Sequence, residues 1–158
     1  MASSTAKKVV VRRFERDRVA GFINPFSYLQ QEAVEVLKTG GTLALIPYSE
    51  VKSVSFVKDF DEEVEYGRIF LNRPKLEGLW VRMLFSDGEV MDGILPNNLL
   101  NWDTVGYTVT PPEPDGNCQK IFVPRLALRS VQILGVVGSP LRPKKTRPGP
   151  DVQPSLFG

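Results

Sequence analysis

The sequence contains no histidine and a single cysteine, Cys118, among 158 residues. The side chain that most often serves as general base, proton shuttle or metal ligand is therefore missing. One cysteine forms no intrachain disulfide, and a cysteine-based zinc site is excluded. No histidine or lysine directly precedes Cys118 to lower its pKa toward that of a nucleophile. These absences argue against an enzyme and predict no cofactor and no bound metal.

Long apolar runs are also missing, since none approaches the roughly 18 residues that a membrane-spanning helix needs. Residues 1–8 are small, polar or basic and lead directly into a β-like segment, which is not the pattern of a signal peptide. We therefore expect a cytoplasmic protein with no membrane partner. The net charge is +2. Residues 139–158 contain four basic residues and one acidic residue, which gives this segment +3 and the rest of the chain −1. The near-neutral remainder leaves nucleic-acid binding possible but not favoured.

The clearest pattern in the chain is the segment Leu79–Leu95. Val81, Met83 and Phe85 alternate with other residues at the period of a β-strand. Asp87-Gly88 supplies the positive φ angles of a tight hairpin turn, after which the chain runs back past Gly93. Residues 9–23 are a fainter copy of this hairpin, with Gly21 in the place of Gly93.

A second pair of matching segments closes each copy. Residues 46–57 and 123–134 share an aliphatic residue and proline, three further residues, an aliphatic and a basic residue, Ser-Val, and two apolar positions. Because proline removes a backbone donor, it ends one strand, and the chain then turns into another. The sequence thus predicts two units, residues 8–58 and 79–138, each holding five short strands. Such units are too small for a two-sheet sandwich.

The predicted fold class is mainly β, with two tandem, strongly bent, five-stranded small barrels of the Sm-like or SH3-like kind. An acidic connection, residues 59–78, joins the units. Within the second unit, one helical turn is expected near Pro96–Thr104, and a short turn is expected after Pro124. Residues 139–158 hold five prolines and little apolar content, which predicts a disordered, basic, proline-rich tail.

Two resemblances follow from these patterns. Each unit resembles an Sm-like barrel, through its Asp-Gly turn, its bent second strand at Gly21 or Gly93, and its short last strand. That resemblance implies RNA or nucleotide binding, and either a pseudo-dimer within the chain or a six-unit ring of three chains. The turns before the last strands, residues 48–50 and 125–127, lack the basic-Gly-Asx element that binds uridine in that superfamily.

The chain as a whole is similar to an uncharacterised family of bacterial proteins over about residues 8–138. The similarity rests on three runs: Val54–Phe60, Leu76–Arg82 and Ile121–Arg125. It implies no function.

Arg12 and Arg16 have the Arg-x-x-x-Arg spacing with which receptors of the PilZ class clamp phosphate groups. The downstream Asp/Asn-x-Ser-x-x-Gly element of such receptors is missing. These two residues are weak anion-binding candidates, and an exposed strand end is the alternative.

The tail carries a short motif, residues 153–157. It is similar to the peptide with which bacterial replication and repair proteins dock onto the sliding DNA clamp, in which Gln, Ser or Asp, Leu and Phe recur. The residues that match are Gln153, Ser155, Leu156 and Phe157, while Pro154 departs from the usual leucine. A disordered tail presents such a peptide in extended form. Two hypotheses follow: a non-enzymatic adaptor with a protein partner, the sliding clamp among the candidates, and an Sm-like nucleic-acid or nucleotide-binding module.

Overall fold

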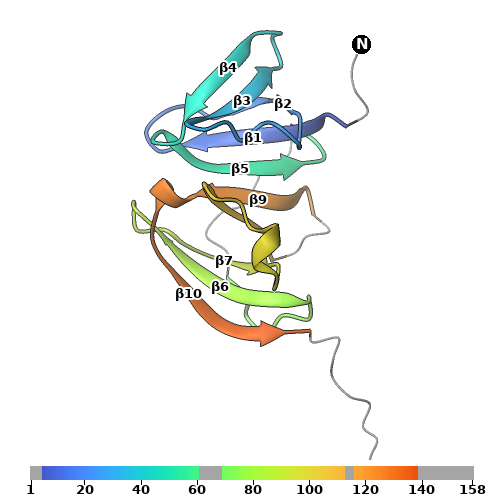
Figure 1. Ribbon diagram of the computed structural model, residues 1–158, viewed down its shortest axis with the longest axis vertical. Coiled ribbons are helices and arrows are strands. Elements are labelled where there is room, and N and C mark those ends of the chain that lie inside the picture. Colours follow the sequence, from blue (N-terminus) through green and yellow to red (C-terminus); the bar gives the residue numbers. More distant parts are fainter. Residues whose placement is uncertain (1–4, 61–68, 113–115, 139–158) are drawn as a thin grey trace, which may run out of the picture.

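The computed structural model describes residues 5–60, 69–112 and 116–138. Within these ranges the protein is mainly β, as predicted, with ten strands and two short 3₁₀ helices (Figure 1). The first half of the chain contains β1 (Lys7–Arg13), β2 (Val19–Ile23), β3 (Ala33–Lys38), β4 (Leu43–Pro47) and β5 (Val51–Val57). The second half contains β6 (Gly78–Phe85), β7 (Val90–Leu95), η1 (Leu99–Asn101), β8 (Gly106–Val109), β9 (Cys118–Pro124), η2 (Arg125–Ala127) and β10 (Leu128–Val137).

The hairpin of β6 and β7 forms as its sequence predicts. The alternating Val81, Met83 and Phe85 are fully buried, and an apolar face of this kind fixes the register of a strand. At the turn, the backbone N–H of Gly88 donates to the Phe85 carbonyl at 2.9 Å, and Gly88 has a φ of 95°. The turn between β3 and β4 uses glycine in the same way, since Gly41 also has a φ of 95°.

Gly21 and Gly93 occupy matching places in the two hairpins. Gly21 on β2 lies opposite Val9, and Gly93 on β7 lies opposite Val81. A Cβ atom on Gly21 would lie 2.4 Å from the carbonyl oxygen of Leu37, and one on Gly93 would lie 2.7 Å from the Cβ of Val109. Both glycines therefore let the following part of the sheet cross the second strand at close range.

The two halves pair their strands in the same order. In the first half the order is β4-β3-β2-β1-β5. In the second half β6 lies between β10 and β7, and β8 pairs with β9. A single bridge, Ile94 with Thr110, continues β7 toward β8. In each half the first strand thus pairs with the second and the fifth, and the fourth strand pairs with the third.

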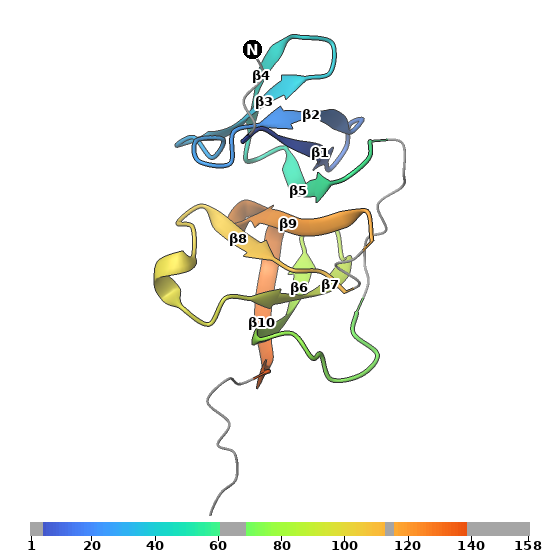
Figure 2. The same cartoon turned by 90° about the vertical axis from the view of Figure 1, so that its right-hand side faces the viewer.

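The prediction that each unit closes into a barrel is wrong. The described strands form an open seven-stranded sheet, β4-β3-β2-β1-β5-β9-β8, and an open three-stranded sheet, β10-β6-β7. The first half stays open because β5 turns its outer edge to β9 of the second half and not to β4. The second half stays open because β7 and β8 share only one bridge. Figures 1 and 2 show β5 and β9 side by side where the halves meet.

The core has two main clusters, one in each half, and one fully buried side chain of the second half belongs to the cluster of the first. Phe122 on β9 is fully buried in the cluster of the first half, among Val54, Tyr28 and Tyr48. Its ring centroid lies 6.1 Å from that of Tyr28 and 6.5 Å from that of Tyr48. Its neighbours Ile121 and Val123 point the other way, into the cluster of the second half. The β5–β9 joint is therefore packed on both faces of β9.

Candidate interaction surfaces

Two of the four strands that end the described sheets, β4 and β10, carry exposed apolar side chains. On β4, Leu43 is 59% exposed and Leu45 is 63% exposed. On β10, Ile133 is 59% exposed and Val136 is 52% exposed. Apolar groups gathered on an unpaired strand edge are a feature of protein–protein contacts, because the edge also offers its backbone hydrogen-bonding groups. These edges are the surfaces best suited to binding another chain.

A basic cleft lies at the joint between the halves. It has a volume of about 560 Å³ and is lined by Lys7 and Lys8 of β1, Lys120 of β9 and Phe56 of β5, together with Pro25, Val57, Leu76, Thr110 and Gln119. The ammonium group of Lys8 lies 5.6 Å from the ring centroid of Phe60. Three lysines around an apolar floor suit an anionic ligand with a planar or apolar part.

An ion cluster joins the halves at the far end of β5. Lys52 is buried, and its ammonium group donates to the Asp87 carboxylate at 2.7 Å and to Glu89. It also lies 5.9 Å from the ring centroid of Phe14 and 5.2 Å from that of Phe85. Burial disfavours the charge, but the hydrogen bonds to both carboxylates outweigh it and raise the pKa of Lys52 above its ordinary value. Lys52 therefore stays charged and serves as a structural link, unsuited to act as a base.

A second buried charge, Asp92 on β7, organises the other face of the β6–β7 hairpin. Its carboxylate is fully buried and accepts from Arg82 Nε at 2.7 Å and Nη2 at 3.0 Å. It also accepts from the Phe70 backbone N–H at 3.0 Å and from Trp80 Nε1 at 3.1 Å. Burial raises the pKa of Asp92, but these donors outweigh burial and hold the pKa below its ordinary value. All the contacts are internal, so this group anchors the connection to the second half.

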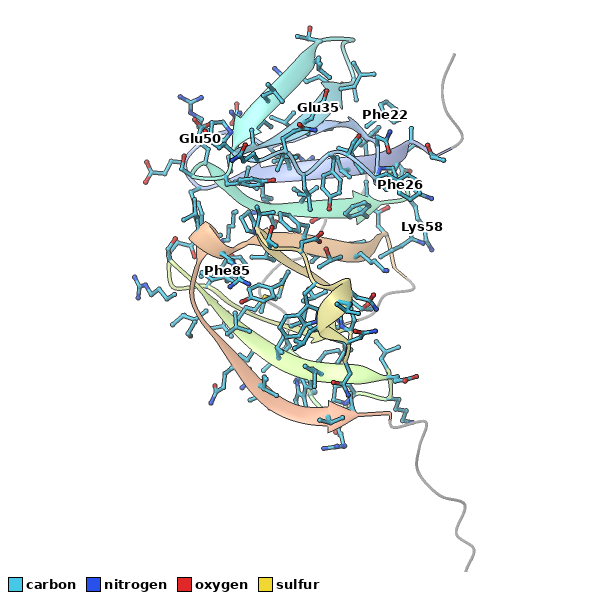
Figure 3. All side chains as sticks on the ribbon, viewed as in Figure 1. Phe22, Phe26, Glu35, Glu50, Lys58 and Phe85 are labelled. Carbon is cyan, nitrogen blue, oxygen red and sulfur yellow. The ribbon has the colours of Figure 1, made fainter. Side chains whose placement is uncertain are left out.

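The anion-binding candidates separate in the structure. Arg16 lies beside Glu50, with Nη1 and Oε1 3.9 Å apart, and the second arginine at Glu50 is Arg13, at 4.0 Å. Arg12 lies on β1 opposite Ser53 and does not line the hollow that holds Arg13, Arg16 and Glu50. Figure 3 shows Glu50 at the opposite end of β5 from Lys58. Anion binding by Arg12 and Arg16 stays a prediction, and the carboxylate of Glu50 would compete with any anion there.

Cys118 fits the sequence interpretation of an unreactive thiol. Burial raises its pKa to about 11, and hydrogen bonds involving Ser55 and Lys120 lower it less than burial raises it. Among the residues that the structure describes, no three histidine, cysteine, aspartate or glutamate side chains cluster as a metal site would require. No helix of the described ranges is both long and apolar enough to cross a membrane.

The predicted tail site, Gln153, Ser155, Leu156 and Phe157, lies outside the described residues. The sequence analysis did not predict the strand edges or the basic cleft as sites. Leu43 and Leu45 carried a usable signal, because apolar residues at alternate positions beside Ala44 and Ile46 make both faces of β4 apolar. The sequence carried no such signal for the cleft, because Lys7 and Lys120 are far apart in the chain.

The fold and these surfaces define a small, mainly antiparallel β protein whose two halves are joined edge to edge. The sequence matches the family described as "Family of unknown function (DUF6982)" over residues 5–135, and the chain belongs to this family. No curated protein and no solved structure matches the chain. Function therefore has to be argued from the surfaces themselves.

Proposed function

We propose that this chain is a non-enzymatic adaptor of the bacterial cytoplasm, which binds another protein chain through its free strand edges. The observation that carries the proposal is the exposure of Leu43 and Leu45 on β4 and of Ile133 on β10, all above half. Proteins usually protect such edges with charges, bulges or a covering element. β4 has no charged residue, so its edge is suited to receive a strand from a partner.

The proposal includes a description of the scaffold. The halves are two copies of one small-barrel plan, each left open where a barrel would close. The same order of pairing in both halves, and the matching places of Gly21 and Gly93, support this description.

The protonation states of Lys52, Asp92 and Cys118 support a binding role over catalysis. Lys52 and Asp92 are held in their charged forms by internal partners. Cys118 is held in its protonated form by burial. None of these three groups is poised to exchange a proton near neutral pH.

A photo-crosslinking amino acid placed at Leu45 in cells tests the adaptor role, with the same replacement at Leu126 as matched control. Leu126 is 69% exposed, close to the value for Leu45, but it lies in the η2 turn, outside any strand edge. We expect one predominant protein adduct from position 45 only. Equal labelling from both positions would refute the adaptor role.

The tail motif is proposed as the adaptor's second contact, with the sliding clamp as its partner. The test is binding of a peptide of residues 148–158 to purified clamp, measured by fluorescence polarisation. The control peptide carries Leu156→Ala and Phe157→Ala, which removes the apolar pair that would fill the clamp's cleft. Equal weak binding by both peptides would remove the clamp from the proposal and leave the role of the strand edges untouched.

Nucleic-acid or nucleotide binding is the second candidate function, and the basic cleft favours it. Lys7, Lys8 and Lys120 supply charge for phosphate groups, and Phe56 supplies an aromatic surface. Fluorescence anisotropy with oligo-U, oligo-A and single-stranded DNA at two salt concentrations tests this function. We expect saturable binding that weakens with salt and is reduced in Lys120→Glu. No saturable binding at low salt would exclude it.

A further inference from the structure

The joint between the two halves shows how these strands bind one another. The last strand of the first half, β5, pairs antiparallel with the fourth strand of the second half, β9. Val54 lies opposite Phe122, and Phe56 lies opposite Lys120. Phe122 is thereby fully buried in the other half, beside Val54. The joint is a sheet ladder reinforced by one inserted apolar side chain.

The same two kinds of strand are left without a partner at the ends of the molecule. Among the described strands, the fourth strand of the first half, β4, pairs only with β3, and the last strand of the second half, β10, pairs only with β6. In Figure 1, β4 lies at one end of the folded body and β10 runs along the other. One chain therefore carries, at each end, one of the two strands that such a joint requires.

The matching prolines fix which residues correspond. β4 ends at Pro47 and β9 at Pro124, so Leu45 takes the place of Phe122, two residues before the proline. By the same count, Leu43 takes the place of Lys120. The Ser-Val pairs of β5 and β10 place Val131 with Val54, and Ile133 with Phe56.

Most of the residues that this correspondence selects are among the exposed large apolar side chains of the described ranges. Leu45, the counterpart of the buried Phe122, is 63% exposed, although Leu43 is also 59% exposed. Ile133, the counterpart of Phe56, is 59% exposed. Val131 is partly buried and packs against the core of the second half. Its counterpart Val54 is fully buried in the core of the first half. The described residues of one chain leave Leu43, Leu45 and Ile133 more than half exposed.

The side chain of Arg73 limits how much of β10 takes part. Its guanidinium Nη2 donates to the carbonyl oxygen of Val136 at 2.6 Å, beyond the segment 131–133 that the correspondence selects. The N-terminal and middle parts of β10 are thus the parts available for a further strand.

We propose that copies of this chain join head to tail, with β10 of one copy pairing antiparallel with β4 of the next. The register is Val131 opposite Leu45 and Ile133 opposite Leu43, and Leu45 covers the core of the second half as Phe122 covers that of the first. The inference rests on the proposed binding role and names its partner, a second copy. Because the two surfaces differ, the contact repeats, and the assembly closes into a ring or continues as an open filament.

Sedimentation velocity on the full chain tests the proposal at concentrations up to about 100 µM, which detects contacts weaker than those of a stable complex. The variants are Leu45→Asp, which blocks β4, and Ile133→Lys, which blocks β10. Leu126→Asp, at an equally exposed leucine outside the edges, is the control. Far-ultraviolet circular dichroism establishes that each variant is folded. We expect the parent and the control to associate, and each edge variant alone to be monomeric.

Mixing the two edge variants separates a head-to-tail contact from a symmetric one. The Leu45→Asp variant has an unchanged β10, and the Ile133→Lys variant has an unchanged β4. One molecule of each can therefore form a single β10–β4 contact. We expect a one-to-one dimer and nothing larger. A parent that stays monomeric, or an edge variant that still associates by itself, would overturn the proposal.

Cysteine pairs test the register. Opposed residues in an antiparallel ladder have Cα atoms about 4.5–5.5 Å apart, within reach of a disulfide. In a Cys118→Ser background, we expect Leu43→Cys to cross-link to Ile133→Cys on another copy and not to Arg129→Cys. Cross-linking at position 129 alone would refute the register.

The crosslinking experiment at Leu45 keeps the two proposals apart. An adduct with a second copy supports both proposals. An adduct with a different protein supports the adaptor role but overturns self-association.

Discussion

Replacing Phe122 by alanine is expected to destabilise both halves, although the residue belongs to the second half. The ring is fully buried in the first core and packs edge-to-face on Tyr28, with an angle of 82° between the rings. Truncating a buried phenylalanine costs about 3–5 kcal/mol, through lost burial and the cavity left behind. The free energy of unfolding of a domain is about 5–15 kcal/mol, so the substitution removes a large share of it.

Urea unfolding followed by two signals measures this effect. Trp80 and Trp102 both lie in the second half, so their fluorescence reports on that half, while circular dichroism reports on all strands. With a slope of about 2 kcal/mol per M, we expect the midpoint to fall by about 2 M in both signals. Lys120→Ala, at an exposed position of the same strand, is the matched control and is expected to leave the midpoint nearly unchanged.

The expectation that both signals move together follows from the β5–β9 ladder, which makes the halves one cooperative body. If the tryptophan midpoint stays in place while the circular dichroism signal splits into two transitions, the halves unfold separately. That outcome would contradict the reasoning about the joint, even if the total loss of free energy has the expected size.

Three further predictions concern single sites. Asp92→Asn is expected to lower the free energy of unfolding by roughly 3 kcal/mol near pH 7, because it disrupts a buried ion pair. Since the folded-state pKa of Asp92 lies below its ordinary 3.8, this contribution is complete above that pH and is lost as the pH falls below it, so parent and variant should converge in acid denaturation. Gly93→Ala should cost about 1–3 kcal/mol in thermal unfolding, because its Cβ would lie 2.7 Å from that of Val109, while Gly40→Ala, with no atom within 4 Å, should be neutral. Cys118, with its pKa of about 11, should react with a disulfide reagent at pH 8 about a hundredfold more slowly than a free thiol, and equally fast reaction would contradict its burial.

Much of the fold was predictable because short-range patterns decide it. The alternation of Val81, Met83 and Phe85 predicts both the strand and its buried face. The Asp87-Gly88 turn follows from the positive φ that glycine tolerates, and β9 ends at Pro124 because proline has no backbone donor. The helical turn expected near Pro96–Thr104 forms at η1, and the short turn expected after Pro124 takes the form of η2.

The candidate surfaces were much less predictable. The basic cleft brings Lys7 of the first strand together with Lys120 of the ninth, across more than a hundred residues of sequence. The pairing of Lys52 with Asp87 depends on how the halves meet, since each residue alone has the pattern of an exposed charge. Arg13 and Arg16 both lie beside Glu50, which the spacing of Arg12 and Arg16 does not indicate, and anion binding by Arg12 and Arg16 stays a prediction.

The sequence by itself determined where most of the strands and turns lie and which faces are apolar. These features depend on the φ preferences of glycine and proline and on side-chain periodicity, which act over a few residues. Only the tertiary structure decided that β5 pairs with β9, that Phe122 enters the opposite core, and that β4 and β10 are left at the ends. A strand edge offers the same backbone donors and acceptors to any partner, so the choice among edges is made by long-range packing and not by local pattern.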